Sequence, residues 1–414
     1  MDKDQLETII NMVRHYDLVI VQRVYLLHIV LKLKTACQIL GKPLIFETDD
    51  DYLSIIPSNP AYFAIIADQD LFTKFSRLQF DASQAGKEGR IQEADDLIKK
   101  ANEMLPLLME SRAAGERDYI EILKLCDGVT TSTQELANTI YPYNKNIGVF
   151  RNNVKQVNPW RLQAPESAFI TENEKGERFV DTDAQARFGI HTKPSYAVVK
   201  DPSGRQMIKR TPRVGYTCTA SHFGEDWNTI SGGLNEVAEK FENGKQGIHP
   251  WWIYFEDKEN QYNPPIFSGT QLYDRARLQF IPPSGYDIYM ANISNLDIGL
   301  APLYHNSFNL SKSDIKAVEY ASWGVCPLLP NIKTYTRSFI DNKTCLTYNN
   351  EQEFAEKLEL LLRSPSLREE IGRNALEYVY SERLAFLDCN TVPRYEFYKK
   401  VLQEAHPLKI WRRQ

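Results

Sequence analysis

Two lysines, a serine and a glutamate lie close together in residues 312–319, and their types suit the binding of a phosphorylated ligand. Ser313 is a good N-cap residue, and Lys312 and Lys316 would place positive charge beside the first turn of a helix beginning there. A helix N-terminus favours an anion, and lysine is a common partner of phosphate. Glu319 could accept hydrogen bonds from hydroxyls. The stretch predicts a diphosphate near residues 313–316 and a sugar or ribose at Glu319, with a surface helix bearing solvated charges as the alternative.

The pattern around these residues would position them at one edge of a sheet. Residues 296–303 have the apolar spacing of a strand with a buried face, and residues 304–312 form a polar loop. The helix that follows ends at Gly324, ahead of an apolar run at residues 325–329. A loop that leads from the carboxyl end of a strand into a helix is where open α/β sheets bind ligands.

The segment SDIKAVEYASWGVCPLL resembles the donor-binding segment of GT-B glycosyltransferases, the glycosyltransferase family 4 or group 1 enzymes. In that family two glutamates lie eight positions apart, and the second opens a run that the residues from Glu319 to Gly324 match. The resemblance implies that Glu319 binds the ribose of a sugar nucleotide and that Lys312 and Ser313 face its phosphates. Ser311 stands where the family has its first glutamate, the residue that normally contacts the donor sugar.

A second donor-side loop follows the strand predicted at residues 214–218, and it resembles the Gly-Ser-x-x-His-x-x-Asp loop of the same family. The resemblance implies that this loop faces the diphosphate and that His222 bonds a phosphate or a hydroxyl; an exposed histidine without a role is the alternative. The predicted catalytic residues are Lys312, Glu319 and His222. The predicted donor-binding residues are Thr219, Ala220, Ser221, Asn309, Ser311, Ser313, Asp314, Ile315, Lys316 and, where relatives hold the base, Pro282.

Three consecutive carboxylates, Asp49, Asp50 and Asp51, follow the strand predicted at residues 43–47. They could hold an acceptor hydroxyl, with one of them acting as a base, and we predict acceptor binding there. A divalent cation site and an acidic loop that caps the next turn are the alternatives. GT-B members generally need no metal, so the resemblance implies no cofactor beyond the nucleoside diphosphate sugar that serves as donor substrate.

The composition narrows the class of protein. The chain has 414 residues and a net charge of -5, so no overall basic field attracts nucleic acid. Its six cysteines include no CxxC pair, which suits reduced core thiols in a cytoplasmic protein. The first residues are acidic and lack the apolar segment of a signal peptide, and no apolar run is long enough to span a bilayer. We therefore expect a cytoplasmic protein of two domains.

Residues 1–153 are predicted to form a Rossmann-like domain on the acceptor side. Only one short helix precedes its first strand at residue 17, whereas the family usually has several strands and a glycine-rich loop there. This domain is therefore expected to be truncated or rebuilt, with a helical insertion at residues 61–124. Residues 213–390 are predicted to form the nucleotide-sugar domain, and residues 391–414 a helix that crosses back to the first domain.

Residues 154–212 are predicted to link the two domains. Five prolines punctuate them, and residues 196–200 and 206–210 flank a turn, as in a β-hairpin. The most basic stretch of the chain, residues 193–213, lies almost wholly in this linker and contains Lys193, Lys200, Arg205, Lys209, Arg210 and Arg213. It could contact a phosphate-bearing acceptor, nucleic acid included, or be a solvated hairpin.

The sequence thus predicts an α/β protein of the GT-B type, with two Rossmann-like domains facing across a cleft. We expect a glycosyltransferase that moves a sugar from a nucleoside diphosphate sugar, such as a UDP-sugar, to an acceptor hydroxyl, retaining configuration and without a metal. The acceptor could be a glycan, a lipid-linked sugar, a protein or modified DNA. Transfer to a hydroxylated base in DNA and a non-catalytic sugar- or nucleotide-binding protein are the alternatives. The base, the sugar and the oligomeric state are not indicated.

Overall fold

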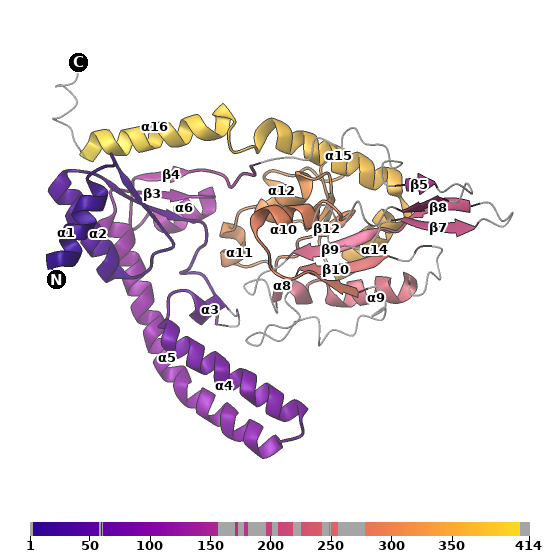
Figure 1. The fold of residues 1–414 in the computed structure, drawn as a ribbon, viewed down its shortest axis with the longest axis horizontal. Coiled ribbons are helices and arrows are strands. Elements are labelled where there is room, and N and C mark those ends of the chain that lie inside the picture. Colours follow the sequence, from indigo (N-terminus) through magenta and orange to yellow (C-terminus); the bar gives the residue numbers. More distant parts are fainter. Residues whose placement is uncertain are drawn as a thin grey trace. The chain divides into compact units, whose positions relative to one another are not determined.

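A computed structural model describes the backbone of most of the chain (Figure 1). The described residues are 3–57, 59, 61–155, 170–172, 178–180, 196–200, 206–217, 225–241, 248, 250–255 and 278–405. The contacts divide the chain into two compact units, each made of separate segments. Unit 1 comprises Met1–Asn152, Asn306–Ser313 and Phe386–Gln414, and unit 2 comprises Asn153–His305 and Asp314–Ala385.

Unit 1 is built on a four-stranded parallel sheet in the order β1-β2-β3-β4. The strands are β1 (Val19–Gln22), β2 (Leu44–Thr48), β3 (Gly128–Thr131) and β4 (Ile147–Val149). The main helices that accompany them are α1 (Lys3–Val13), α2 (Leu27–Leu40), α6 (Gln134–Ile140) and the carboxyl-terminal α16 (Asp388–Ala405). β2 and β3 are almost entirely buried, as expected for parallel strands covered on both faces.

Three helices between β2 and β3 form the expected helical insertion of unit 1: α3 (Ala61–Ala64), α4 (Gln69–Lys87) and α5 (Ile91–Leu125). Asp68 caps α4 by accepting from the backbone N–H of Leu71 at 2.8 Å. α4 and α5 lie side by side around a core of their own that includes Phe75 and Leu108 (Figure 1). The last turns of α5 join the core of the sheet instead, through residues such as Tyr119.

Unit 2 is built on a six-stranded parallel sheet in the order β11-β10-β9-β12-β13-β14. The strands are β9 (Arg213–Thr217), β10 (Trp251–Phe255), β11 (Leu278–Phe280), β12 (Ile298–Leu300), β13 (Cys326–Pro330) and β14 (Leu346–Tyr348). This is the order of the doubly wound nucleotide-binding folds, in which the chain reverses direction across the sheet between β9 and β12. Ligands bind such sheets at the carboxyl ends of the strands beside this switch point.

Helices of unit 2 pack against its sheet through a large apolar core that includes Trp252, Phe241, Leu328 and Phe354. These helices are α8 (Glu225–Asn228), α9 (Ser231–Phe241), α10 (Tyr286–Ile293), α12 (Ile315–Ala321), α13 (Lys333–Thr336), α14 (Glu351–Arg363) and α15 (Pro365–Glu382). None of the helices in the described part of the chain has the length and apolar character needed to cross a membrane.

Four cysteines confirm the expectation of core thiols. Cys37, Cys126, Cys326 and Cys345 are buried and unbridged. Burial raises the pKa of Cys37 to about 11, so its unreactive thiol form dominates at neutral pH.

Two local differences separate the structure from the sequence-based expectations. The predicted polar loop contains a short helix, α11 (Ser307–Ser311), because Asn306 accepts from the backbone N–H of Asn309 and caps it. α12 begins at Ile315 rather than after Ser313, with Asp314 in the N-cap position. Asn306 was therefore the local signal for a helix start that the sequence analysis missed.

The predicted hairpin is confirmed as β7 (Tyr196–Lys200) paired antiparallel with β8 (Gln206–Arg210), although the turn between them lies outside the described residues. A second pair, β5 (Ile170–Glu172) and β6 (Arg178–Val180), was not expected. Arg213, counted above with the basic stretch, is fully buried at the start of β9. Its charge is therefore not part of an exposed basic surface.

Candidate active site

Tyr320 fixes α12 at the switch point of the unit 2 sheet. Its hydroxyl donates to the carbonyl of Leu300, at the end of β12, at 2.8 Å, and accepts from the backbone N–H of Thr217, at the end of β9, at 3.0 Å. Gly299 makes room for this arrangement, since a Cβ at that position would lie 2.4 Å from the Tyr320 ring. These two bonds hold α12 at the carboxyl edge of the sheet, where sheets of this type bind ligands.

Lys316, Glu319 and Tyr289 form a polar cluster on the same helix and its neighbour α10. The Tyr289 hydroxyl donates to Glu319 Oε2 at 2.8 Å, and Lys316 Nζ lies 2.9 Å from that hydroxyl and 3.3 Å from the same carboxylate oxygen. The Glu319 side chain is 12% exposed and that of Lys316 is 21% exposed. At the carboxyl edge of the sheet, the cluster therefore has a carboxylate that can accept from ligand hydroxyls and an ammonium group that can bind a phosphate.

Asp314, directly before α12, is held by a buried arginine from the end of α15. Arg383 donates from Nη1 and Nη2 to the two Asp314 carboxylate oxygens, each at 2.7 Å. Arg383 also donates to the hydroxyl of Tyr378 at 3.0 Å and lies 3.3 Å from Asn153 Oδ1. Burial by itself would raise the pKa of Asp314, but the hydrogen bonds and charge of Arg383 outweigh it, and the pKa is lowered. This bidentate pair anchors the start of the helix that carries Lys316 and Glu319.

The segment just before Asp314 packs in unit 1. Thr133 Oγ1 donates to the Ser311 carbonyl at 2.7 Å, and Asn152 Nδ2 donates to Ser313 Oγ at 2.9 Å. Lys312 is 7% exposed, with Nζ 4.5 Å from the centre of the Phe308 ring. Four of the predicted donor-side residues, Lys312 among them, thus belong by their contacts to the same unit as the acidic loop.

The acidic loop after β2 has three differently placed carboxylates. Asp49 pairs with Arg23 at 2.8 Å, whereas Asp51 is buried and its Oδ2 lies within 3.5 Å of Ser311 Oγ. Burial, followed by the charge of Asp49, raises the pKa of Asp50, and the charge of Lys312 opposes this rise. The structure therefore brings Asp50 and Asp51 together with Ser311 and Lys312, a proximity that the sequence did not reveal.

The remaining predicted site residues fall in several places. Thr219, Ala220, Ser221 and His222 lie outside the described residues. Pro282 is exposed shortly after β11, Ile315 is half-buried in the first turn of α12, and Asn309 is buried in α11. The predicted set is thus divided: Asn309, Ser311, Lys312, Ser313 and the three aspartates are in unit 1, and Asp314, Ile315, Lys316, Glu319 and Pro282 are in unit 2.

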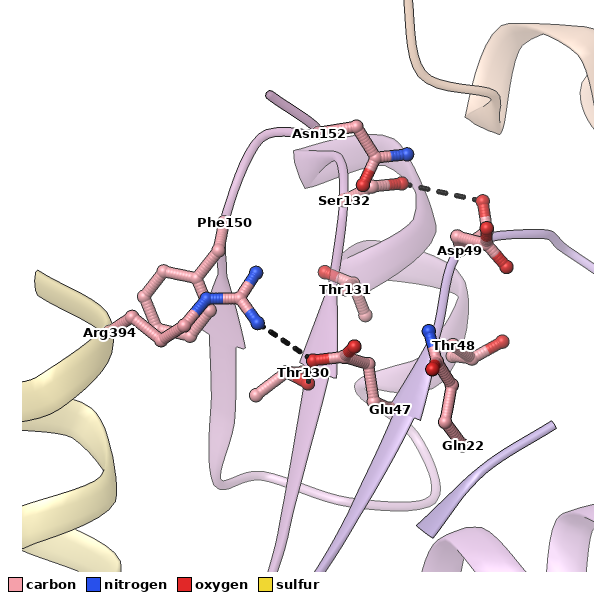
Figure 2. A pocket seen from close by; sticks show the side chains of 10 residues that line it. All are labelled: Gln22, Glu47, Thr48, Asp49, Thr130, Thr131, Ser132, Phe150, Asn152 and Arg394. Atoms are coloured by element: carbon pink, nitrogen blue, oxygen red, sulfur yellow. Dashed lines mark hydrogen bonds and ion pairs between the residues drawn. The ribbon is translucent and has the colours of Figure 1, made fainter. Parts of the chain in front are cut away.

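A pocket in unit 1 opens at the carboxyl ends of its strands (Figure 2). It is lined by Gln22, Glu47, Thr48, Asp49, Thr130, Thr131, Ser132, Phe150, Asn152 and Arg394, and its volume is about 40 Å³. Of these, only Asp49 was predicted from the sequence. Arg394 comes from α16, which follows β2 by more than 300 residues, so no local pattern could have indicated it.

The described residues contain no group of three or more histidine, cysteine, aspartate or glutamate side chains arranged to hold a metal ion. Of the three aspartates for which a cation site is the alternative, Asp49 pairs with Arg23 and Asp51 lies against Ser311.

Comparison with known families and structures adds to this geometry. Residues 265–387 match the profile of a family described as glycosyl transferase-like. The matched range contains the whole cluster of Tyr289, Lys316 and Glu319, and also Arg383. Among curated proteins, no match to the chain is found.

Several solved structures share the fold at low sequence identity. Anabaena Alr3699/HepE in complex with UDP and glucose is 11% identical, with a TM-score of 0.54 over 98% of this chain and 82% of that one. Sucrose-phosphate synthase from Thermosynechococcus elongatus is 11% identical, with a TM-score of 0.53 over 97% of this chain and 78% of that one. A UDP-forming α,α-trehalose-phosphate synthase from Burkholderia xenovorans is 11% identical, with a TM-score of 0.50 over 96% and 76% of the two chains.

The predicted α/β fold of the GT-B type is confirmed, and residues 265–387 match the glycosyl transferase-like profile. The resemblance to glycosyltransferases noted in the sequence is confirmed at the level of this domain and of the fold.

Proposed function

We propose that this chain, with its glycosyl transferase-like domain on a GT-B fold, moves a sugar from a nucleoside diphosphate sugar to an acceptor hydroxyl. The proposal is supported most by the cluster of Lys316, Glu319 and Tyr289 at the carboxyl edge of the unit 2 sheet. In the resembling family the residue matching Glu319 binds the ribose of the donor. That HepE was solved with UDP and glucose is consistent with a UDP-sugar here.

The chemical task is to stabilise negative charge that develops on the departing diphosphate. The bond between the sugar C1 and the phosphate oxygen breaks, and a bond from C1 to the acceptor oxygen forms. Lysine ammonium groups fixed by their surroundings can stabilise the leaving group without a metal, and we assign this role to Lys316 and Lys312. The loop of Thr219, Ala220, Ser221 and His222 would contribute further donors to the phosphates or sugar hydroxyls.

On the acceptor side we assign the hydroxyl to the loop of Asp49, Asp50 and Asp51 in unit 1. By the resemblance, the configuration at C1 is retained, and the proton of the acceptor hydroxyl passes to the leaving phosphate. The raised pKa of Asp50 would also suit a group that accepts a proton more readily than an ordinary aspartate. We further propose that the enzyme acts without a metal and in the cytoplasm.

The test is release of nucleoside diphosphate from a panel of UDP- and GDP-sugars. We expect the wild type to consume at least one of them, and Glu319→Gln or Lys316→Met to lower the rate by roughly 10- to 100-fold. That range corresponds to losing one hydrogen bond to a charged group, about 1.5–3 kcal/mol.

Two changes elsewhere in unit 2 serve as matched controls. Glu359 is, like Glu319, a partly buried glutamate paired with lysine, here Lys240. Glu359→Gln and Lys240→Met should leave the rate within a factor of about two of the wild type, in line with the small effect of partly exposed ion pairs. Equal losses in both sets would contradict the assignment of Lys316 and Glu319 to the donor.

A non-catalytic nucleotide-sugar-binding protein is the second candidate, and Ser311 favours it. The residue stands where the resembling family has the glutamate that contacts the donor sugar, and here its main chain is bonded to Thr133. Binding of UDP-sugars by the wild type with no release of UDP over hours, in the presence of an acceptor panel, would support this candidate.

A further inference from the structure

The pocket described above is lined by residues of unit 1 alone and is shaped by groups that the resemblance does not assign. Its walls come from the ends of all four strands and from α16 (Figure 2). Every lining side chain except Phe150 is polar: four hydroxyls, two amides, two carboxylates and one guanidinium. In α/β sheets, such a position at the carboxyl ends of parallel strands is a common ligand site.

Glu47 is the centre of an internal hydrogen-bond network in this pocket. Arg394 Nη1 donates to Glu47 Oε2 at 2.8 Å, and Thr130 Oγ1 donates to the same oxygen at 3.1 Å. The Arg394 guanidinium also lies over the Phe150 ring, 5.0 Å from its centre. The positive charge of Arg394 is therefore already satisfied by a carboxylate and an aromatic face, which leaves it a weak attractor for a phosphate.

Asp49 supplies an acceptor that the protein does not use. Its Oδ2 pairs with Arg23, but Oδ1 is buried and has no hydrogen-bond partner among the described residues. Buried polar atoms are nearly always hydrogen-bonded, so an orphan carboxylate oxygen beside a pocket points to a ligand that donates to it. A sugar hydroxyl is such a donor.

Charge and size narrow the ligand further. Each carboxylate that lines the pocket is paired with an arginine, Glu47 with Arg394 and Asp49 with Arg23, so the lining leaves no unpaired positive charge for a phosphate or a nucleic acid backbone. The space of about 40 Å³ is that of a few water molecules, which fits one edge of a sugar ring rather than a whole saccharide. Phe150 is the only apolar side chain among the residues that line the pocket, so the pocket has little apolar surface against which a lipid chain could pack.

We infer that this pocket is the acceptor subsite and that it takes two neighbouring hydroxyls of a neutral sugar, with Asp49 and Glu47 as hydrogen-bond acceptors. The inference rests on the proposed function and selects among its acceptors: a neutral glycan or glycoside is favoured over a sugar phosphate and over DNA. Arg394 is assigned as a positioning residue, since it contacts both Glu47 and Phe150 and holds them in place.

The test uses saturation-transfer difference NMR to measure the binding of chosen probes to the full chain. The probes are the methyl glycosides of glucose, galactose and mannose, glucose 6-phosphate, and a short single-stranded DNA. We expect at least one methyl glycoside to bind, Asp49→Asn to weaken that binding at least tenfold, and Glu47→Gln to weaken it as well. Asp81→Asn, which alters an aspartate paired with Arg77 on α4, should leave the binding unchanged.

Stabilisation by UDP, read as a rise in Tm, is measured in parallel on each variant and reports on the donor side alone. An unchanged rise in Asp49→Asn shows that the variant is folded and that the lost site is not the donor site. The inference is overturned if no methyl glycoside binds, if binding survives both pocket variants, or if glucose 6-phosphate or DNA binds in their place. Absence of any UDP effect in the wild type would instead contradict the proposed function.

Discussion

Asp50 lies where its charge is disfavoured. Burial and the neighbouring Asp49 raise its pKa above the ordinary value, and the positive charge of Lys312 offsets only part of this rise. Its folded-state pKa therefore exceeds the unfolded value of about 3.9, so the folded state binds the proton more tightly. The stability associated with this proton is fully present below the unfolded pKa and is lost as the pH rises through the folded pKa.

Asp50→Asn should consequently raise the Tm at pH 7 to 8, because the uncharged amide avoids the penalty of a buried carboxylate. The gain should shrink as the pH falls and should vanish near pH 4, where the wild-type carboxyl is protonated as well. Differential scanning fluorimetry between pH 4 and pH 8 measures this, with the exposed Asp95→Asn as the control. Equal Tm values for wild type and Asp50→Asn at every pH would show that Asp50 carries no such penalty.

The stability cost of a charged carboxylate at Asp50 is consistent with a role for this residue in the activity. Proteins retain destabilising charges mainly where activity requires them, so a gain in stability at Asp50 is expected to accompany a loss of transfer. This links the residue to the acceptor role proposed for its loop.

Among the secondary-structure elements, α12 is held in place by a residue that is distant from it in the sequence. Its start is fixed by the bidentate bonds from Arg383 to Asp314, and both side chains are almost wholly buried. Removing one partner of a buried pair strands the other charge, at a cost of about 3–5 kcal/mol, whereas replacing both with apolar residues is often neutral.

Arg383→Met should therefore lower the free energy of unfolding of unit 2 by about 3–5 kcal/mol, and Arg383→Met combined with Asp314→Leu should recover most of it. Urea unfolding of the two single variants and the double variant gives the coupling energy. Because the pKa of Asp314 is lowered in the folded state, the contribution of the pair is present above about pH 4 and is lost as the pH falls further. A single-variant cost below about 1 kcal/mol, the range of exposed pairs, would contradict this account.

Local sequence signals explain which elements were predicted correctly. β9 and β13 are apolar runs, and they were expected because parallel strands buried on both faces have that pattern. The register of α12 was expected too, since its apolar positions recur with helical period. α11 was missed because the polar segment around it lacks that periodicity, and only the cap at Asn306 indicates it.

The groups of the candidate sites were less predictable, for a physical reason. Lys316 and Glu319 are neighbours on one helix, so spacing alone placed them together. Tyr289, Arg383 and Arg394 contact partners 30, 69 and 347 residues away, and such pairs depend on tertiary packing that no local pattern records. The acidic loop was found by composition, but its proximity to Ser311 was not.

At the scale of the whole molecule, the fold defines one edge at which we propose that a nucleotide binds. The strand order of unit 2 puts the switch point between β9 and β12, and α12 is tied there through Tyr320. The likeness to solved GT-B structures extends over nearly the whole chain. The proposed sugar transfer therefore requires that a nucleoside diphosphate bind at this edge of unit 2.

Hydrogen–deuterium exchange, followed peptide by peptide with and without saturating UDP, tests this requirement most directly. We predict slower exchange in peptides that cover α12 and the end of β9, and no change in α4 and α5, which serve as the internal reference. GDP is run in parallel because the base is not assigned. Unchanged exchange at α12 and β9 with both nucleotides, or protection confined to unit 1, would contradict the assignment of the donor to this site.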